Sequence, residues 1–298
     1  MSLNKKNISM FNFTNHIFLC VFSLFTFASN ITYAHQISSD DYSVFTNPTN
    51  EPSKSIGSYA NGCIQGALAL PDDLHYKLVY PSRNRYWGHG ITIDFIKNLS
   101  RDIYSTEGNG LLIGDLSQPR GGPMTWGHKS HQTGLDVDIY FAKKPQDELS
   151  DNDLKKLALI SLLDKKQENI NQDIWSKYYS NLLQRVSDDA NVSRVFVNPI
   201  IKNQLCLDNK GDRSWLGKIR PWGGHYEHFH VRLKCDKNSE ECIEQHSVPT
   251  GDGCGKELDN WLEKGLKVYS SNKKPVIPKE LFLHNHPISC MALFDDLN

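Results

Sequence analysis

The sequence predicts an α+β fold: a small central antiparallel sheet with flanking helices and long loops closed by disulfides. Residues 135–141 and 228–233 alternate apolar and polar side chains, which is typical of strands with one buried face. Other stretches repeat apolar residues at helical intervals. After Leu233 the chain is rich in Cys, Gly and Pro and has a single short helical pattern. This end is therefore expected to be a loop-rich tail, starting at about residue 234.

The individual elements are predicted from the same two periodicities. Helices are expected over residues 91–105, 153–163, 175–186 and 258–266. Strands are expected over residues 111–115, 135–141, 194–198 and 228–233. Residues 35–60 are polar and rich in Ser, Asn and Pro, which indicates an extended lead-in segment. The folded part is therefore expected to start near Cys63.

Residues 1–34 are predicted to be a secretory signal peptide. Lys5 and Lys6 precede an apolar run over residues 17–28, and Thr32-Tyr33-Ala34 suits cleavage after Ala34. The run is shorter than the roughly 18 to 20 residues that span a bilayer, so no membrane insertion of the mature chain is expected. Residues 35–298 contain no Gly/Ser-rich or Pro-rich linker and are expected to form one domain.

Charge and cysteine content narrow the classes of partner and site. The formal net charge is -1 and the basic residues are not clustered, which argues against nucleic-acid binding. Of seven cysteines, Cys20 lies in the predicted leader, and the even number left in an exported chain predicts disulfides. No two cysteines form a CxxC pair, so a thiolate zinc site is not expected. Cys235 and Cys242 could close a local loop, but spacing does not determine the pairing.

Two short segments, residues 127–138 and 223–230, hold five of the twelve histidines. In the first, His131 and Asp138 are seven residues apart with Gly134 between them, so a turn can bring the histidine beside an aspartate on the next strand. Zn²⁺ prefers imidazole nitrogen and carboxylate oxygen, and a catalytic zinc site uses three protein ligands and leaves a fourth position to water. The first segment therefore supplies two candidate ligands locally.

In the second segment, His228 and His230 share one strand face, so that one can bind a metal while the other stands beside the bound water. Asp136 and Arg232 lie on the same faces and could orient the ligands, although exposed polar surface is the commoner role for such residues. A histidine pair on a strand is usually only polar surface, and Asp138 could be a buried ion-pair partner. The two segments together favour a His/Asp/His zinc site.

Motifs over almost the whole mature chain carry a family resemblance. The pattern Ser130-His131-x-x-Gly134-x-x-x-Asp138, followed by His228-x-His230, resembles zinc peptidases of the lysostaphin, D-alanyl-D-alanine and hedgehog types. Within that group the chain most resembles the penicillin-insensitive murein endopeptidases. The narrower resemblance lies in Ser55–Ser58, Asn61–Cys63, Arg85–His89, Leu112–Asp115, Ser130–Ile139, Val195–Pro199, Arg220–Trp222, His228–Arg232 and Gly251–Gly255.

The resemblance implies roles for particular residues. His131, Asp138 and His230 would bind the catalytic zinc, while His228 and His225 would face the reacting carbonyl, either one being the base. Implied disulfides join Cys63 to Cys290, Cys206 to Cys254, and Cys235 to Cys242.

A second metal is also implied for the family, bound by the equivalent of His128 and by an Asp/His pair further along. This chain offers Asp164, but Gln167 and Glu168 stand where the second histidine is expected.

The implied activity is hydrolysis of the D-alanyl–meso-diaminopimelyl cross-links of periplasmic peptidoglycan (murein) by zinc-activated water. Such an enzyme is insensitive to penicillin because it has no serine nucleophile for a β-lactam to trap. Trp87, His89, Trp126 and Trp222 could line the substrate groove, although aromatic residues are more often in the core. Neither the oligomeric state nor the preferred cross-link follows from the sequence.

Two alternatives come from other classes. A serine D,D-peptidase needs Ser-x-x-Lys with partner motifs, and residues 270–274 supply only the first element. A non-catalytic peptidoglycan-binding domain of the same fold would be expected to lack part of the ligand trio, which is complete here. The His-Glu-x-x-His motif is absent, which excludes only the thermolysin-like layout.

Overall fold

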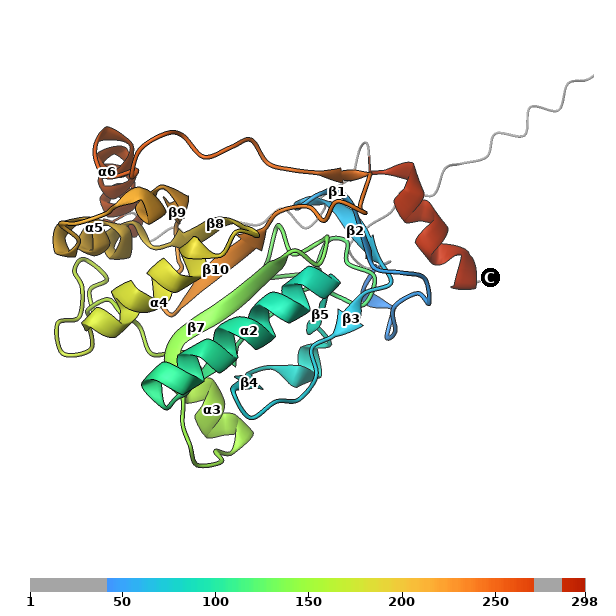
Figure 1. Cartoon of the computed structure of the whole chain (residues 1–298), viewed down its shortest axis with the longest axis horizontal. Helices are drawn as coiled ribbons and strands as arrows, with labels where there is room; N and C mark the ends of the chain where they lie inside the picture. Colours follow the sequence, from blue (N-terminus) through green and yellow to red (C-terminus); the bar gives the residue numbers. More distant parts are fainter. Residues whose placement is uncertain (1–41, 271–285, 298) are drawn as a thin grey trace, which may run out of the picture. The chain divides into compact units, whose positions relative to one another are not determined.

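A six-stranded sheet organises the chain around the histidine-rich segments (Figure 1). This computed structural model describes residues 42–270 and 286–297, which lie in the unit Gln36–Asn298. The predicted signal peptide, residues 1–34, lies outside the described residues. The strand order is β4 (Tyr76–Leu78), β6 (Gly110–Ile113), β7 (Asp136–Lys144), β10 (His228–Leu233), β8 (Val192–Val197) and β9 (Ile219–Pro221).

The four central strands of this sheet pair antiparallel, while the edge strands β4 and β9 run parallel to their neighbours. The predicted α+β class with an antiparallel centre is confirmed. In the central β7–β10 pair, His230 lies opposite Asp138 and Arg232 opposite Asp136. Because side chains alternate along a strand, these residues share one face of the sheet.

The other face of the same strands is the main hydrophobic core. Val137, Ile139, Phe229 and Val231 are fully buried there together with apolar residues of the helices. Helices α2 (Gly90–Glu107) and α4 (Lys177–Asp188) supply several of these residues and lie against the sheet (Figure 1). The face that carries Asp138 and His230 is thus backed by a buried apolar layer.

The remaining helices confirm or correct individual predictions. The predicted helix over residues 258–266 is confirmed within α6 (Lys256–Ser270). Helix α3 (Asp151–Ala158) ends before the predicted end at residue 163, because the Leu162 N–H donates to the Tyr226 carbonyl and not to a carbonyl of the helix. Helix α5 (Pro199–Asp208) was not predicted, although Asn198 caps it by accepting the Ile200 N–H and proline suits its first turn.

The expectation that the fold starts near Cys63 is wrong. Strand β1 (Lys54–Ser58) pairs with β2 (Asn61–Gln65) and with β11 (Cys242–Ile243). Tyr42 and Phe45 are also buried, packed with Phe294 of the C-terminal 3₁₀ helix η3 (Ile288–Leu297). The polar composition of residues 35–60 concealed these few apolar side chains, since their partners lie at the far end of the sequence.

Three disulfides fasten the tail and confirm the pairing implied by the resemblance: Cys63–Cys290, Cys206–Cys254 and Cys235–Cys242. Short elements complete the described part, namely β3 (Leu68–Ala69), β5 (Trp87–Gly88), and the 3₁₀ helices η1 (Pro81–Arg83) and η2 (Ser214–Lys218). In the part of the chain that the structure describes, none of the helices has the length and apolarity that crossing a bilayer requires.

Candidate metal centre

A tight turn before β7 brings His131 beside Asp138. Gly134 in this turn has φ +72°, and a side chain there would lie 2.4 Å from Ile64 Cδ1. His131 itself has φ +67°, a left-handed conformation that non-glycine residues seldom adopt. As a result, His131 Nε2 lies 3.4 Å from Asp138 Oδ1. The seven-residue spacing had led us to expect this proximity.

His230 on β10 completes a triangle with these two residues. Its Nδ1 lies 3.1 Å from His131 Nε2 and 3.4 Å from Asp138 Oδ1. The strand register accounts for this position, because His230 pairs directly with Asp138 across β7 and β10. All three side chains are buried.

The outward nitrogens of both imidazoles have acceptors that set their tautomers. His131 Nδ1 donates to the Leu116 carbonyl at 2.7 Å, and His230 Nε2 donates to Asp136 Oδ1 at 2.9 Å. His131 Nε2 and His230 Nδ1, which face each other at 3.1 Å, therefore both carry lone pairs. When both imidazoles are neutral, no proton lies between these two nitrogens. Within the described residues, Asp138 Oδ1 is also buried without a hydrogen-bond partner. A metal cation among these three atoms would satisfy all of them.

Electrostatics at this point favour positive charge. Burial opposes a charge on His131, but the carboxylates of Asp138, Asp136 and Asp115 together outweigh it and raise the pKa of the imidazole. Burial likewise opposes ionisation of Asp138, yet His131 and His228 hold its pKa well below the usual range. The carboxylate is therefore ionised, and a cation beside it is favoured.

His128 approaches the same carboxylate from its other oxygen. Its Nδ1 lies 3.6 Å from Asp138 Oδ2, and His128, His131 and Asp138 offer ligand atoms within 4.8 Å of one another. Its Nε2 contacts Asp115 Oδ2 at 3.1 Å. Asp115 was not among the predicted site residues, although an aspartate just after the apolar strand β6 was a usable signal.

His228 and His225 border the triangle. His228 Nε2 lies 3.7 Å from Asp138 Oδ2, and the ring centroids of His228 and His225 are 5.0 Å apart. His225 Nδ1 donates to the Gly223 carbonyl at 2.9 Å, which leaves its Nε2 with a lone pair. Burial lowers the pKa of each imidazole to about 4, so both are neutral near pH 7.

The expectation of exposed polar surface for Asp136 and Arg232 is wrong. Asp136 is fully buried and accepts from Arg232 Nε at 2.8 Å, from His230 Nε2 and from the His131 backbone N–H at 2.9 Å. The Arg232 guanidinium lies over the Tyr59 ring at 4.2 Å. The alternating pattern placed both residues on the correct face but did not reveal the segments that cover it.

A hollow of about 340 Å³ opens beside the triangle. Its walls include Phe196, Trp222, His225 and His230, and half of the Trp222 surface is exposed. Of the other residues predicted for a groove, Trp126 is half exposed outside this hollow.

Two further residues expected in a groove have structural contacts elsewhere. Trp87 donates its Nε1 to Asn84 Oδ1 at 2.8 Å. His89 is buried as the N-cap of α2, so a groove position is wrong for it.

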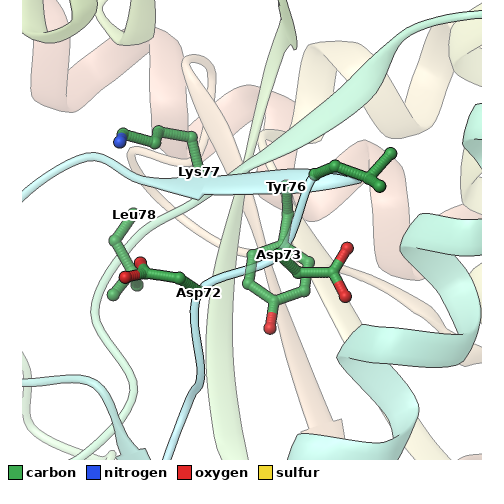
Figure 2. Close-up of a pocket in the computed structure, with 6 residues that line it drawn as sticks. Asp72, Asp73, Tyr76, Lys77 and Leu78 are labelled. Carbon is green, nitrogen blue, oxygen red and sulfur yellow. The ribbon is translucent and has the colours of Figure 1, made fainter.

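A second hollow lies along the edge strand β4, lined by Asp72, Asp73, Tyr76 and Lys77 among others (Figure 2). None of its lining residues belongs to the histidine cluster. The chemistry-bearing residues therefore gather at the hollow beside β10 and not here.

The protein thus has a candidate metal centre. It consists of two imidazoles and one carboxylate that converge on a buried point on the polar face of an antiparallel sheet. Comparison with known proteins gives its family. The sequence profile described as penicillin-insensitive murein endopeptidase matches residues 55–295, and the chain belongs to this family of peptidases. The resemblance carried by the motifs is thereby confirmed.

Curated relatives with the name penicillin-insensitive murein endopeptidase match most of the chain. The Yersinia enterocolitica protein is 40% identical over 254 residues, which cover 84% of this chain and 89% of the relative. The protein from Klebsiella pneumoniae subsp. pneumoniae is 40% identical over 264 residues, with 88% and 94% covered. The Citrobacter koseri protein is 40% identical over 252 residues, with 84% and 89% covered.

Proposed function

We propose that the chain is an exported zinc endopeptidase that hydrolyses D-alanyl–meso-diaminopimelyl cross-links of murein in the periplasm. Residues 35–298 would form its single catalytic domain. The observation that carries this proposal is the triangle of His131 Nε2, Asp138 Oδ1 and His230 Nδ1, in which the buried Asp138 oxygen has no hydrogen-bond partner among the described residues. Family membership and the names of the relatives support murein as the substrate.

The donor set fits zinc in both chemistry and size. Ligands placed 2.0–2.2 Å from a zinc ion at the corners of a tetrahedron lie about 3.3–3.6 Å apart. The three edges of the observed triangle are 3.1, 3.4 and 3.4 Å. His131, Asp138 and His230 would therefore hold the ion, and three ligands leave one position open, as in catalytic sites. When bound, zinc supplies Lewis acidity, making water a nucleophile near neutral pH and polarising a carbonyl.

His128 is the remaining proposed ligand residue. It faces Asp138 Oδ2, whereas the triangle uses Oδ1, so His128 would approach a metal from the other oxygen of the same carboxylate. Its hydrogen bond to Asp115 orients the ring for this contact.

His228 and His225 would move the protons. Both imidazoles are neutral near pH 7, so either can accept a proton from the attacking water and return it to the leaving nitrogen. His228 is our first choice as base, because its Nε2 is 3.7 Å from the Asp138 carboxylate. His225 is the second choice, since its Nε2 is not used by the bond to Gly223.

Digestion of purified murein with and without a chelator tests the activity. We expect cross-linked dimers to disappear and monomers to accumulate, chelator to stop the reaction and added zinc to restore it. His131→Ala, Asp138→Ala and His230→Ala should each lose both the metal and the activity. Full zinc content in all three variants would contradict the site, and intact dimers after incubation with the zinc-loaded wild type would favour a binding domain instead.

A further inference from the structure

A cationic and aromatic surface borders the candidate centre on its β6 side. We call it the Arg83 flank and define it by Tyr80, Arg83, Arg85, Asp115 and Trp126. The Arg83 guanidinium lies 3.5 Å from the centroid of the Tyr80 ring and 4.9 Å from that of Trp126. The Arg85 guanidinium lies 4.1 Å from the centroid of the Trp126 ring. Two arginines are therefore arranged around one half-exposed tryptophan.

The two arginines of this flank are not equivalent. Arg85 is buried, and its terminal nitrogens contact Asp115 Oδ2 at 3.0 Å and the Trp126 carbonyl at 3.1 Å. Arg83 uses Nη1 for Asp115, at 3.1 and 3.3 Å, and 27% of its side chain is exposed. Arg85 thus supports the flank from inside, while the Arg83 side chain is partly exposed to solvent.

Charge on the Arg83 flank is unbalanced in favour of cations. The carboxylate of the Arg83 flank is that of Asp115, and 2% of this side chain is exposed. Both Arg83 and Arg85 form ion pairs with it. The neighbouring His128 Nε2 contacts the same carboxylate at 3.1 Å. One carboxylate facing two guanidinium groups leaves a net positive charge, which would attract an anion.

The flank adjoins the hollow through residues 127–130, which follow Trp126 and line the hollow. The sheet order places β6, which precedes Asp115, on one side of the β7–β10 pair, and β8 and β9 on the other. The hollow is bordered on the β8–β9 side by Phe196 and Trp222. A substrate bridging the two sides therefore crosses the candidate centre between its ends.

We propose that Arg83, held between Tyr80 and Trp126, binds a carboxylate of the cross-linked stem peptide and so selects substrates with a free carboxylate. This inference rests on the proposed function and names a specificity-determining residue for it. The diaminopimelyl residue at the proposed scissile bond bears a free carboxylate on the carbon that carries the leaving amine. A planar guanidinium recognises such a group by paired hydrogen bonds.

Neutralisation of Asp115 alone does not account for Arg83. Arg85 already forms a buried ion pair with that carboxylate, and His128 Nε2 donates to the same oxygen. A second, partly exposed arginine side chain with its guanidinium between two aromatic rings is not needed to compensate one buried negative charge. Ligand recognition gives its exposed surface a role.

The test compares two cross-linked muropeptides that differ only in the diaminopimelyl carboxylate, free in one and amidated in the other. We expect the zinc-loaded wild-type protein to cleave the free form with a kcat/KM about 10- to 100-fold higher, the range for a hydrogen bond to a charged group. In Arg83→Gln this preference should vanish, mainly through KM, while zinc affinity stays at the wild-type value. Arg83→Lys should restore part of the preference.

Arg185→Gln is the matched control, because Arg185 is also a partly exposed arginine paired with one aspartate, Asp102, at 2.7 Å. It should keep the wild-type preference. Equal cleavage of both muropeptides by the wild type would overturn the Arg83 proposal and leave the proposed function standing. Cleavage of neither would overturn both, and a preference retained in Arg83→Gln would also overturn the assignment.

Discussion

Asp136 and His230 are joined by a 2.9 Å hydrogen bond from His230 Nε2 to Asp136 Oδ1, on adjacent strands beneath the candidate centre. The other oxygen of Asp136 accepts the backbone N–H of His131 at 2.9 Å. One carboxylate therefore fixes the tautomer of one proposed ligand and the left-handed backbone of another. Arg232 keeps it ionised, because its charge holds the pKa of Asp136 well below the usual range despite burial.

The first prediction follows from this double role. Asp136→Asn is expected to weaken zinc binding by about 10- to 100-fold, because the amide is a weaker acceptor for His230 and leaves Arg232 without its counter-charge. Competition with a chelator of known affinity measures the effect. Asp153→Asn, at an exposed ion pair with Lys156, should leave zinc affinity unchanged. Wild-type affinity in Asp136→Asn would show that the carboxylate does not support the metal.

The second prediction separates metal binding from proton transfer. His228→Ala is expected to keep zinc and the fold but to lose about 10²-fold or more in turnover, the scale for removal of an acid-base group. Zinc content, thermal unfolding and murein digestion should be measured on the same preparation. His225→Ala, examined in parallel, shows which imidazole matters more. Near-normal cleavage by His228→Ala would remove His228 from the mechanism.

The candidate site was easier to predict from sequence than the contacts that support it. Strand alternation placed His228, His230 and Asp138 on the polar faces of their strands, because a period of two is a local property. The bond between Asp136 and the His131 backbone joins residues close in sequence, yet it depends on the positive φ of His131, which the turn predicted at Gly134 did not reveal. The contact between Asp115 and His128 depends on the path of the loop that follows β6, which local sequence patterns do not describe.

Parts of the fold escaped prediction for a related reason. Tyr42 and Phe45 are buried only because η3, at the opposite end of the sequence, covers them. Local composition cannot report such a partner. By contrast, both ends of α2 and α4 were predicted to within about two residues. A continuous apolar stripe along a helix can be recognised without knowing which part of the core it packs against.

The third prediction compares how much two of the disulfides, Cys63–Cys290 and Cys235–Cys242, stabilise the fold. Cys63–Cys290 spans 227 residues and Cys235–Cys242 spans seven. The entropy that a cross-link removes from the unfolded chain grows with loop length, giving about 5 kcal/mol for the long loop and about 2 kcal/mol for the short one. Urea unfolding of the two double alanine variants measures the free energies. A larger loss in the Cys235/Cys242 variant would contradict this ranking.

The last prediction concerns Lys202, which is fully buried on α5. Its Nζ donates to the carbonyls of Leu216 at 2.7 Å and Asp252 at 2.6 Å, and a neutral amine still has the two N–H groups that these bonds need. Burial, together with the nearby Arg220, lowers the pKa of Lys202 from 10.5 to about 7. The folded state therefore holds the uncharged amine more readily than the unfolded chain does.

Because the pKa of Lys202 is lower in the folded state, the unfolded chain binds more protons between about pH 7 and 10.5, and stability should rise with pH in that window. The contribution is on the order of 1.4 kcal/mol per pH unit. Urea unfolding at several pH values should show a shallower rise for Lys202→Met, even though losing both hydrogen bonds destabilises this variant throughout. Lys156→Met, at an exposed position, should keep the wild-type slope. Equal slopes in the wild type and Lys202→Met would mean that Lys202 stays charged in the fold, with the two carbonyls and Asp252 compensating its burial.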